Sequence, residues 1–163
     1  MSDETVVTGI EQCWQAVRGE VEGLDLAAPV YPDPVWTVRD VLLHCAFWND
    51  ETVKAIVACR SGRTYVTDTG AESFDAGLDA MNQRVVEASR SVPEDEVRER
   101  WMGAQDAFTD AVRALDAEML AREIVAPWDE RMPMPRMIDE ELGHEQGHVA
   151  DIISAISASE GER

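Results

Sequence analysis

The stretch PVWTVRDVLLHCAFWND, residues 34–50, decides the fold that we expect. Thr37 is followed three residues later by Asp40, which is the pattern of a helix N-cap with an acidic partner in the first turn. Apolar residues then recur at steps of three and four, as the buried stripe of a helix requires. The sequence therefore predicts a helix over residues 38–60 that carries His44 in its first half.

The same spacing recurs in other parts of the chain. Residues 5–25 show one amphipathic helical pattern, and residues 136–158 show another. Between them, residues 78–88 and 97–115 are periodic on either side of Pro93. Because proline interrupts a helix, these two segments predict either a bent pair of helices or one helix with a short leader.

Proline-rich segments separate these helices. We expect AAPVYPDPVW and APWDERMPMP to be loops, because proline removes a backbone donor and restricts the residue before it. No segment shows a convincing strand pattern, although RTYVT could form a brief extended piece. Four principal helices with proline-marked joints indicate an all-α protein, a four-helix bundle in which residues 1–163 form a single domain.

Composition limits the partners and the compartment. Acidic residues outnumber basic ones 33 to 14, and the net charge of −19 would repel nucleic acid and anionic membranes. The three cysteines are widely spaced within apolar helical patterns, so we expect reduced thiols in the core. The chain shows neither a long apolar stretch nor a signal-like N-terminus, so we expect a cytoplasmic protein.

Two of the three histidines lie in GHEQGHVADI, residues 143–152. On a helix, His144 and His148 lie one turn apart and project toward a common point. A divalent ion that keeps a position open for water or substrate needs a third protein ligand, and His44 is the remaining histidine. The pattern predicts a three-histidine metal site. The alternative is that the pair are ordinary surface residues, capped by neighbouring carboxylates.

The same segment matches the zinc-peptidase pattern H-E-x-x-H, with Glu145 in the position of the base. A peptidase would also need a substrate-aligning strand and a further ligand downstream, and no histidine follows His148. A metallopeptidase stays open as an alternative. No spacing in the chain assembles a Ser-His-Asp or Cys-His nucleophile system.

Residues 34–50 resemble the second-helix signature of the DinB/YfiT-like metalloenzyme superfamily, in which Trp-Thr-x-Arg-Asp/Glu precedes a metal-ligand histidine. HEQGHVADI is similar to the paired histidines on the last helix of that superfamily, and residues 79–115 are similar to its third helix and leader. The resemblance covers nearly the whole chain. It departs at Gly147 and Val149, where many members have a further histidine or basic residue beside the second of the pair.

The resemblance implies a DinB/YfiT-like bundle in which His44, His144 and His148 hold a divalent metal, commonly zinc or nickel. Related members include thiol-dependent transferases and isomerases, which implies that the metal presents a low-molecular-weight thiol as a thiolate. We therefore expect an S-transferase or isomerase that acts on a small molecule. A metal-dependent hydrolase and a non-catalytic metal-binding stress protein are the alternatives. The apolar faces of the bundle also predict a homodimer.

Metal-bound imidazoles need neighbours that accept their remaining N–H. The candidates at helical spacing are Asp40, Glu51, Glu140, Glu141 and Asp151. Of these, we expect Glu51 and Asp151 to be catalytic bases near the metal. Trp36 and Trp48 could form walls of the pocket or part of the core, and Asn82 could reach the site or face solvent.

Overall fold

The computed structural model describes residues 3–161, and the other four residues of the predicted domain (1, 2, 162 and 163) lie outside the described range. The helices are α1 (Asp3–Val21), α2 (Val38–Arg60), α3 (Phe74–Ser89), α4 (Glu94–Arg113), α5 (Ala117–Leu120) and α6 (Met134–Gly161). The strands are β1 (Pro29–Pro32), β2 (Val35–Thr37), β3 (Glu123–Val125) and β4 (Arg131–Pro133). The predicted all-α class is confirmed, because the strands form only two small hairpins.

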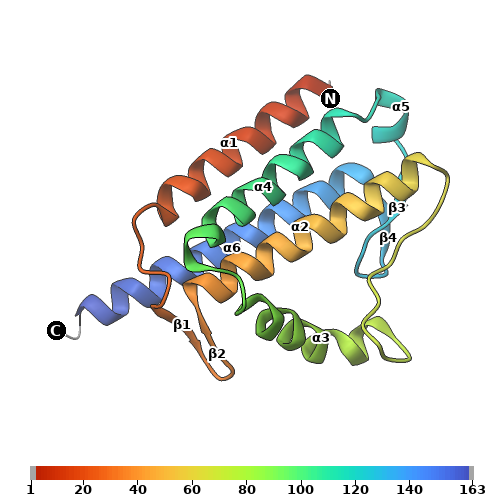
Figure 1. The fold of residues 1–163 in the computed structure, drawn as a ribbon. Coiled ribbons are helices and arrows are strands. Elements are labelled where there is room, and N and C mark those ends of the chain that lie inside the picture. The colour runs from red at the N-terminus through yellow and green to blue at the C-terminus, as the bar shows by residue number, and fades with distance from the viewer. Residues whose placement is uncertain (1–2, 162–163) are drawn as a thin grey trace.

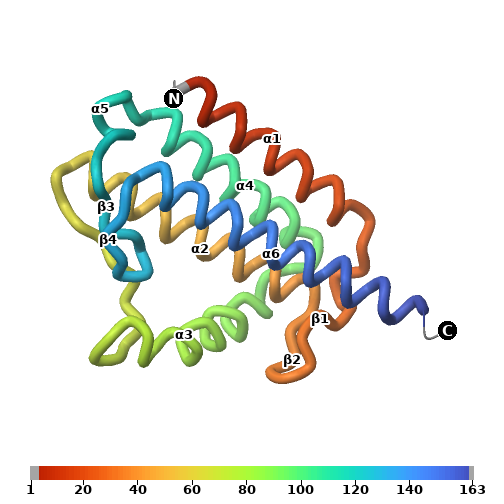
Figure 2. Tube along the Cα trace, turned by 180° about the vertical axis from the view of Figure 1, so that it is seen from behind, coloured from red at the N-terminus to blue at the C-terminus, as the bar shows by residue number. Residues whose placement is uncertain are grey.

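Four helices, α1, α2, α4 and α6, form the predicted bundle (Figure 1). Helix α2 packs against α4 and α6, and α1 also packs against α4 and α6. The shorter α3 lies beside the bundle, on the side of α2 away from α1, and the C-terminal part of α6 extends past the other helices (Figure 2). The two periodic segments around Pro93 are therefore separate helices, and only the second of them belongs to the bundle.

The start of α2 is where the sequence predicts it. The Asp40 carboxylate accepts hydrogen bonds from the backbone N–H of Thr37, at 3.0 Å, and from its hydroxyl, at 3.1 Å. The backbone N–H groups at the start of a helix have no partner within it. The bonds between Thr37 and Asp40 help to fix the conformation of the chain there. Asp40 also pairs with Arg90, which follows α3. This residue therefore caps a helix and does not orient His44.

The end of α1 differs from the prediction. The helix ends at Val21, and the N–H of Leu24 then bonds to the carbonyl of Val21 in a turn. Gly23 adopts a φ of 75°, which is a conformation that favours glycine and stops a helix. The apolar periodicity continues through Leu24 because that side chain still packs against the core.

Both proline-rich segments take part in β-hairpins, contrary to the prediction of loops: the first contains β1 and most of β2, and the second contains the turn after β3 and strand β4. In the first hairpin Tyr31 pairs with Trp36, and in the second Ile124 pairs with Met132. Proline is tolerated there because every strand of a two-stranded sheet is an edge strand. Strands of three or four residues are too short to show an alternating pattern, which is why the sequence conceals them. RTYVT has no regular secondary structure.

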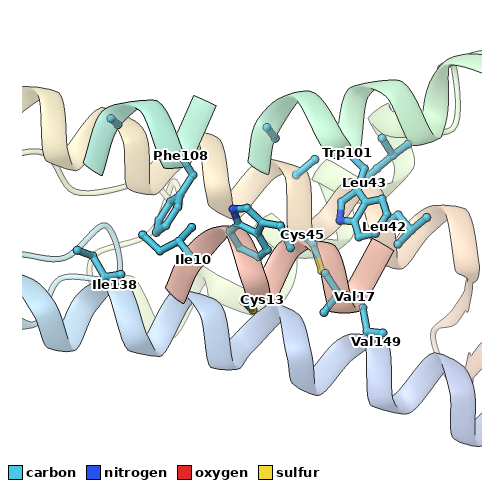
Figure 3. Close-up of a cluster of buried hydrophobic side chains, with 14 of the residues drawn as sticks. Ile10, Cys13, Val17, Leu42, Leu43, Cys45, Trp101, Phe108, Ile138 and Val149 are labelled. Atoms are coloured by element: carbon cyan, nitrogen blue, oxygen red, sulfur yellow. The ribbon is translucent and has the colours of Figure 1, made fainter. Parts of the chain in front are cut away.

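The hydrophobic core lies between the four bundle helices (Figure 3). Ile10 from α1, Leu42 from α2, Phe108 from α4 and Ile138 from α6 are all fully buried in it. The three cysteines are free thiols as predicted, with Cys13 and Cys45 buried and Cys59 half-buried. Within residues 3–161, no helix combines the length and the apolarity that crossing a bilayer requires.

Candidate metal centre

Helices α2 and α6 bring the three histidines together. One ring nitrogen from each of His44, His144 and His148 lies within 4.8 Å of the other two. The Nε2 atoms of His144 and His148 are 3.1 Å apart, as expected for side chains one turn apart on a helix. The ring centroid of His44 lies 5.3 Å from that of His144 and 4.9 Å from that of His148. The nitrogens therefore converge on one point, and His44 lies beside the pair that the helical spacing predicted.

The surroundings favour the uncharged form of His44 and His148. His44 is only 3% exposed, and burial lowers its pKa to about 2, with His148 and His144 contributing to the shift. Burial and the neighbouring His144 also lower the pKa of His148 to about 4, although Asp151 acts in the opposite direction. A neutral imidazole carries a free lone pair, which is the form that binds a metal. The chemistry of this donor set fits a divalent ion.

Tyr31 in strand β1 fixes the orientation of His148. Its hydroxyl donates to Oδ2 of Asp151 at 2.6 Å and lies 2.8 Å from Nδ1 of His148. Because its single proton goes to the carboxylate, the hydroxyl oxygen accepts from Nδ1–H of His148. That tautomer leaves the lone pair on Nε2, which faces His144. Asp151, expected as a base, thus acts on His148 through Tyr31.

Glu141 lies beside Nδ1 of His144, as Tyr31 lies beside Nδ1 of His148. Its Oε1 atom lies 3.8 Å from Nδ1 of His144, and its Oε2 atom accepts a hydrogen bond from Thr52 at 3.3 Å. Oε1 of Glu141 and Nδ1 of His144 are both buried, and neither has a hydrogen-bond partner among the described residues. A small side-chain movement would join them, so Glu141 is the group placed to hold this second ring.

A cavity of about 390 Å³ lies next to the histidines. Its lining comes from α2, α3, α6 and the two hairpins, and comprises Trp36, His44, Trp48, Phe74, Leu78, Asn82, Trp128, Glu140, Glu141, His144 and His148. Trp36, Trp48 and Asn82 therefore lie at the site. For each of them this was one of the two positions that the sequence left open. Nε1–H of Trp48 donates to Oδ1 of Asn82 at 3.3 Å, which joins α2 to α3 beside the cavity.

The structure places Glu51 away from this cavity. Its carboxylate accepts hydrogen bonds from Tyr65 and Thr67, both at 2.7 Å, and from Lys54 at 2.5 Å. Burial alone would raise the pKa of Glu51, but these donors lower it. Its contacts tie the segment after α2 to that helix. The role of Glu51 as a base stays a prediction that no contact with the histidines supports.

Glu145 points into the bundle core and not toward the histidines. It is 0% exposed and accepts hydrogen bonds from Asn49 at 2.6 Å, Trp101 at 2.7 Å and Gln105 at 2.5 Å. Neighbouring residues of a helix point about 100° apart, which separates Glu145 from His144. A peptidase of the H-E-x-x-H type needs this carboxylate beside the metal, so the geometry does not support that alternative.

The sequence did not identify two residues of the site, Tyr31 in the first hairpin and Trp128 in the second. Both lie in hairpins, where no helical period assigns a side chain to a face. The direction of the Tyr31 side chain is set by its pairing with Trp36 across the first hairpin, which the sequence does not reveal. Cys45 lies next to His44 in sequence, but it is buried in the core, and burial raises its pKa.

The family described as "Mycothiol maleylpyruvate isomerase N-terminal domain" matches residues 10–146. No curated protein matches the chain. The crystal structure of the mycothiol-dependent maleylpyruvate isomerase has a TM-score of 0.72 and 12% identity, and the match covers 93% of this chain. It covers 61% of that enzyme, so this chain spans about three fifths of its length. A histidine-to-alanine mutant of the enzyme matches with the same TM-score at 11% identity.

An uncharacterised protein from Clostridium difficile 630 has a TM-score of 0.72 and 14% identity, with 93% of this chain and 94% of that one covered. At these identities the structural matches show the fold alone, which is the DinB-like helical bundle. The family match extends over most of the chain, from the first helix to residue 146 in α6, and includes His44 and His144. The chain therefore belongs to the mycothiol maleylpyruvate isomerase N-terminal domain family, within the DinB/YfiT-like superfamily.

Proposed function

We propose that this protein is a divalent-metal-dependent enzyme that transfers a low-molecular-weight thiol to a small electrophile, or isomerises that electrophile through a thiol adduct. The observation that supports this most strongly is the convergence of His44, His144 and His148 at the wall of a cavity. Family membership supports the thiol, because both the family and the structurally similar isomerase are described by their use of mycothiol.

The histidines supply the metal ligands in this proposal. Imidazole nitrogens suit both zinc and nickel, so both ions remain candidates. When bound, the ion would lower the pKa of a thiol and so supply a thiolate at neutral pH. Tyr31 holds the ring of His148 so that Nε2 faces His144, and Glu141 is placed to do the same for His144.

The remaining lining residues hold the electrophile. Trp48, Phe74 and Trp128 form apolar walls that exclude water from the reacting atoms. With an alkene as electrophile, the thiol loses its proton and its sulfur bonds to one alkene carbon, while the neighbouring carbon takes up a proton to give a thioether. If, after rotation about the carbon–carbon bond, the neighbouring carbon gives up a proton as the carbon–sulfur bond breaks, the product is the isomeric alkene, and the proton returns to the sulfur to regenerate the thiol.

The test is a thiol-transfer assay followed by proton NMR. Zinc-loaded protein is mixed with mycothiol and with either maleate or its diethyl ester, so that the outcome does not depend on the charge of the electrophile. We expect the thioether or the fumarate isomer to form faster than without protein. The His148→Ala variant should fall to the uncatalysed rate, whereas Gln146→Ala, an exposed position on the same helix, should keep the wild-type rate.

Uncatalysed rates with both electrophiles, or equal rates in wild type and His148→Ala, would contradict the proposal. Ester cleavage that needs no thiol would instead support the hydrolase alternative.

A further inference from the structure

The cavity beside the histidines lacks a group that could neutralise an anion. Its walls are largely aromatic and aliphatic, and its polar side chains other than the histidines are Asn82, Glu140 and Glu141. Of the described residues that line the cavity, none is lysine or arginine. Two of these three polar groups are carboxylates, which would repel the carboxylate of a ligand.

Three basic side chains of the neighbouring elements already have partners. Arg136, one turn before Glu140 on α6, forms ion pairs with Glu140 at 2.7 Å and Glu130 at 3.3 Å. Lys54 of α2 pairs with Glu51, and Arg84 of α3 donates to the backbone carbonyl of Thr69 at 2.9 Å. The net charge of −19 adds a long-range field of the same sign.

We infer that the electrophile bound in this cavity is an uncharged, largely apolar molecule and not a carboxylate such as maleylpyruvate, and this inference rests on the proposed function. A carboxylate transferred from water to an apolar site without a counter-charge loses its hydration and gains no partner. In the proposed reaction the metal ion binds the thiolate and is not available to a carboxylate of the electrophile. That carboxylate would instead face Glu140 and Glu141. A cationic molecule would in turn be repelled by the ion.

The inference is tested by calorimetric titration with three probes of the same shape: naphthalene-2-carboxamide, naphthalene-2-carboxylate and (naphthalen-2-yl)methylammonium. The full chain is used after treatment with a chelator, so that no probe gains affinity by ligating an ion. The titration is made at pH 8, where imidazole is neutral. We expect the carboxamide to bind at least about tenfold more tightly than the carboxylate, because the carboxylate loses its hydration without a partner. The ammonium probe, which can pair with Glu140, should also bind more tightly than the carboxylate.

Two variants of one cavity residue sharpen the test. Leu78 on α3 is half-buried and lines the cavity, so it tolerates a longer side chain. Leu78→Arg supplies the missing cation and should make the carboxylate the best of the three probes. Leu78→Met, an apolar control of similar size, should keep the wild-type preference.

The inference is overturned if the carboxylate probe binds wild type as tightly as the carboxamide or the ammonium probe, if no probe binds, or if Leu78→Arg leaves the preference unchanged. Because these titrations use neither metal nor thiol, their outcome is independent of the transfer assay. A protein without thiol-transfer activity could still show this preference, and an active one could lack it.

Discussion

Tyr31 links the first hairpin to the histidine site. Its hydroxyl bonds to Asp151 and to Nδ1 of His148, and these contacts determine which nitrogen of His148 faces the other histidines. An imidazole whose far N–H is held loses less freedom when it binds a metal and is a better ligand. Tyr31 is therefore a positioning residue in the proposed site.

Replacing Tyr31 with phenylalanine should weaken zinc binding about tenfold, the lower end of the effect seen for such neighbours of metal ligands. The measurement is a competition titration against a chromophoric chelator. Tyr65→Phe is the matched control, because Tyr65 bonds to Glu51 and is remote from the histidines. Equal zinc affinities in Tyr31→Phe and Tyr65→Phe would contradict the role assigned to Tyr31.

Glu51 should affect stability and its dependence on pH. The pKa of Glu51 is lower in the folded protein than in the unfolded chain, because Lys54, Thr67 and Tyr65 donate to it. Its stabilising effect is therefore complete above the unfolded pKa of about 4.3 and is lost as the pH falls through the lower folded value. Glu51→Gln should lower the free energy of unfolding at pH 7 by about 1–3 kcal/mol.

The measurement for Glu51 is urea unfolding between pH 3 and 7. The loss of stability toward low pH should be smaller in Glu51→Gln than in wild type. An unchanged stability together with a lost thiol-transfer activity would instead restore Glu51 as a catalytic candidate.

The three histidines could be predicted because each lies in a strongly periodic helix, where spacing fixes the face of a side chain. The family resemblance then joined His44 to the pair on α6. Tyr31 and Trp128 could not be predicted, because their positions depend on hairpins and on how these pack against α6 and α3. The partners of Glu51 could not be predicted either, because Tyr65 and Thr67 come from an irregular segment that returns to α2.

At the scale of the element, α6 has two faces with different chemistry. His144 and His148 face the cavity, whereas Glu145 and Val149 face the core. The three donors to Glu145 come from Asn49 on α2 and from two residues of α4, so this carboxylate joins three helices of the bundle. Burial raises the pKa of Glu145, and the three hydrogen bonds offset part of that shift.

Glu145→Gln should destabilise the fold and leave zinc binding intact. The amide NH₂ would face groups that are all donors, which should lower the free energy of unfolding by about 1–3 kcal/mol. Thermal unfolding would show this as a shift of roughly 2–4 °C for each kcal/mol. Gln146→Glu, the converse change at an exposed position, is the control and should have little effect. Unchanged stability with lost activity would revive the peptidase alternative.

The elements that periodicity could predict are the long helices, and α2 begins and ends where the sequence places it. The ends of α1 and α6 differ by a few residues, since capping and packing decide them and periodicity does not. The hairpins were missed because three-residue strands carry no pattern, and their stability comes from packing against the bundle. Ile124 and Met132 are both buried there.

At the scale of the molecule, the homodimer stays a prediction. Large exposed hydrophobic side chains among residues 3–161 are confined to Val35 and Val57, which form no extended apolar face. Size-exclusion chromatography with light scattering should give a mass near twice 18.1 kDa if the predicted dimer forms. A single species of 18.1 kDa across the concentration range would contradict it.

The other molecular expectations rest on charge and composition. The net charge of −19 is the reason to expect neither nucleic acid nor an anionic membrane as a partner, and the single-domain organisation and cytoplasmic location likewise stay predictions. The fold is the feature for which the prediction and the structure agree best. Its four bundle helices, with the site between α2 and α6, follow from patterns visible in the chain.

The central claim is that His44, His144 and His148 hold one divalent ion. Its most direct test is elemental analysis of protein purified without a histidine tag, with His148→Ala and Gln146→Ala purified in parallel. We predict close to one zinc or nickel ion per chain in wild type and Gln146→Ala, and almost none in His148→Ala. Equal metal content in wild type and His148→Ala would contradict the account.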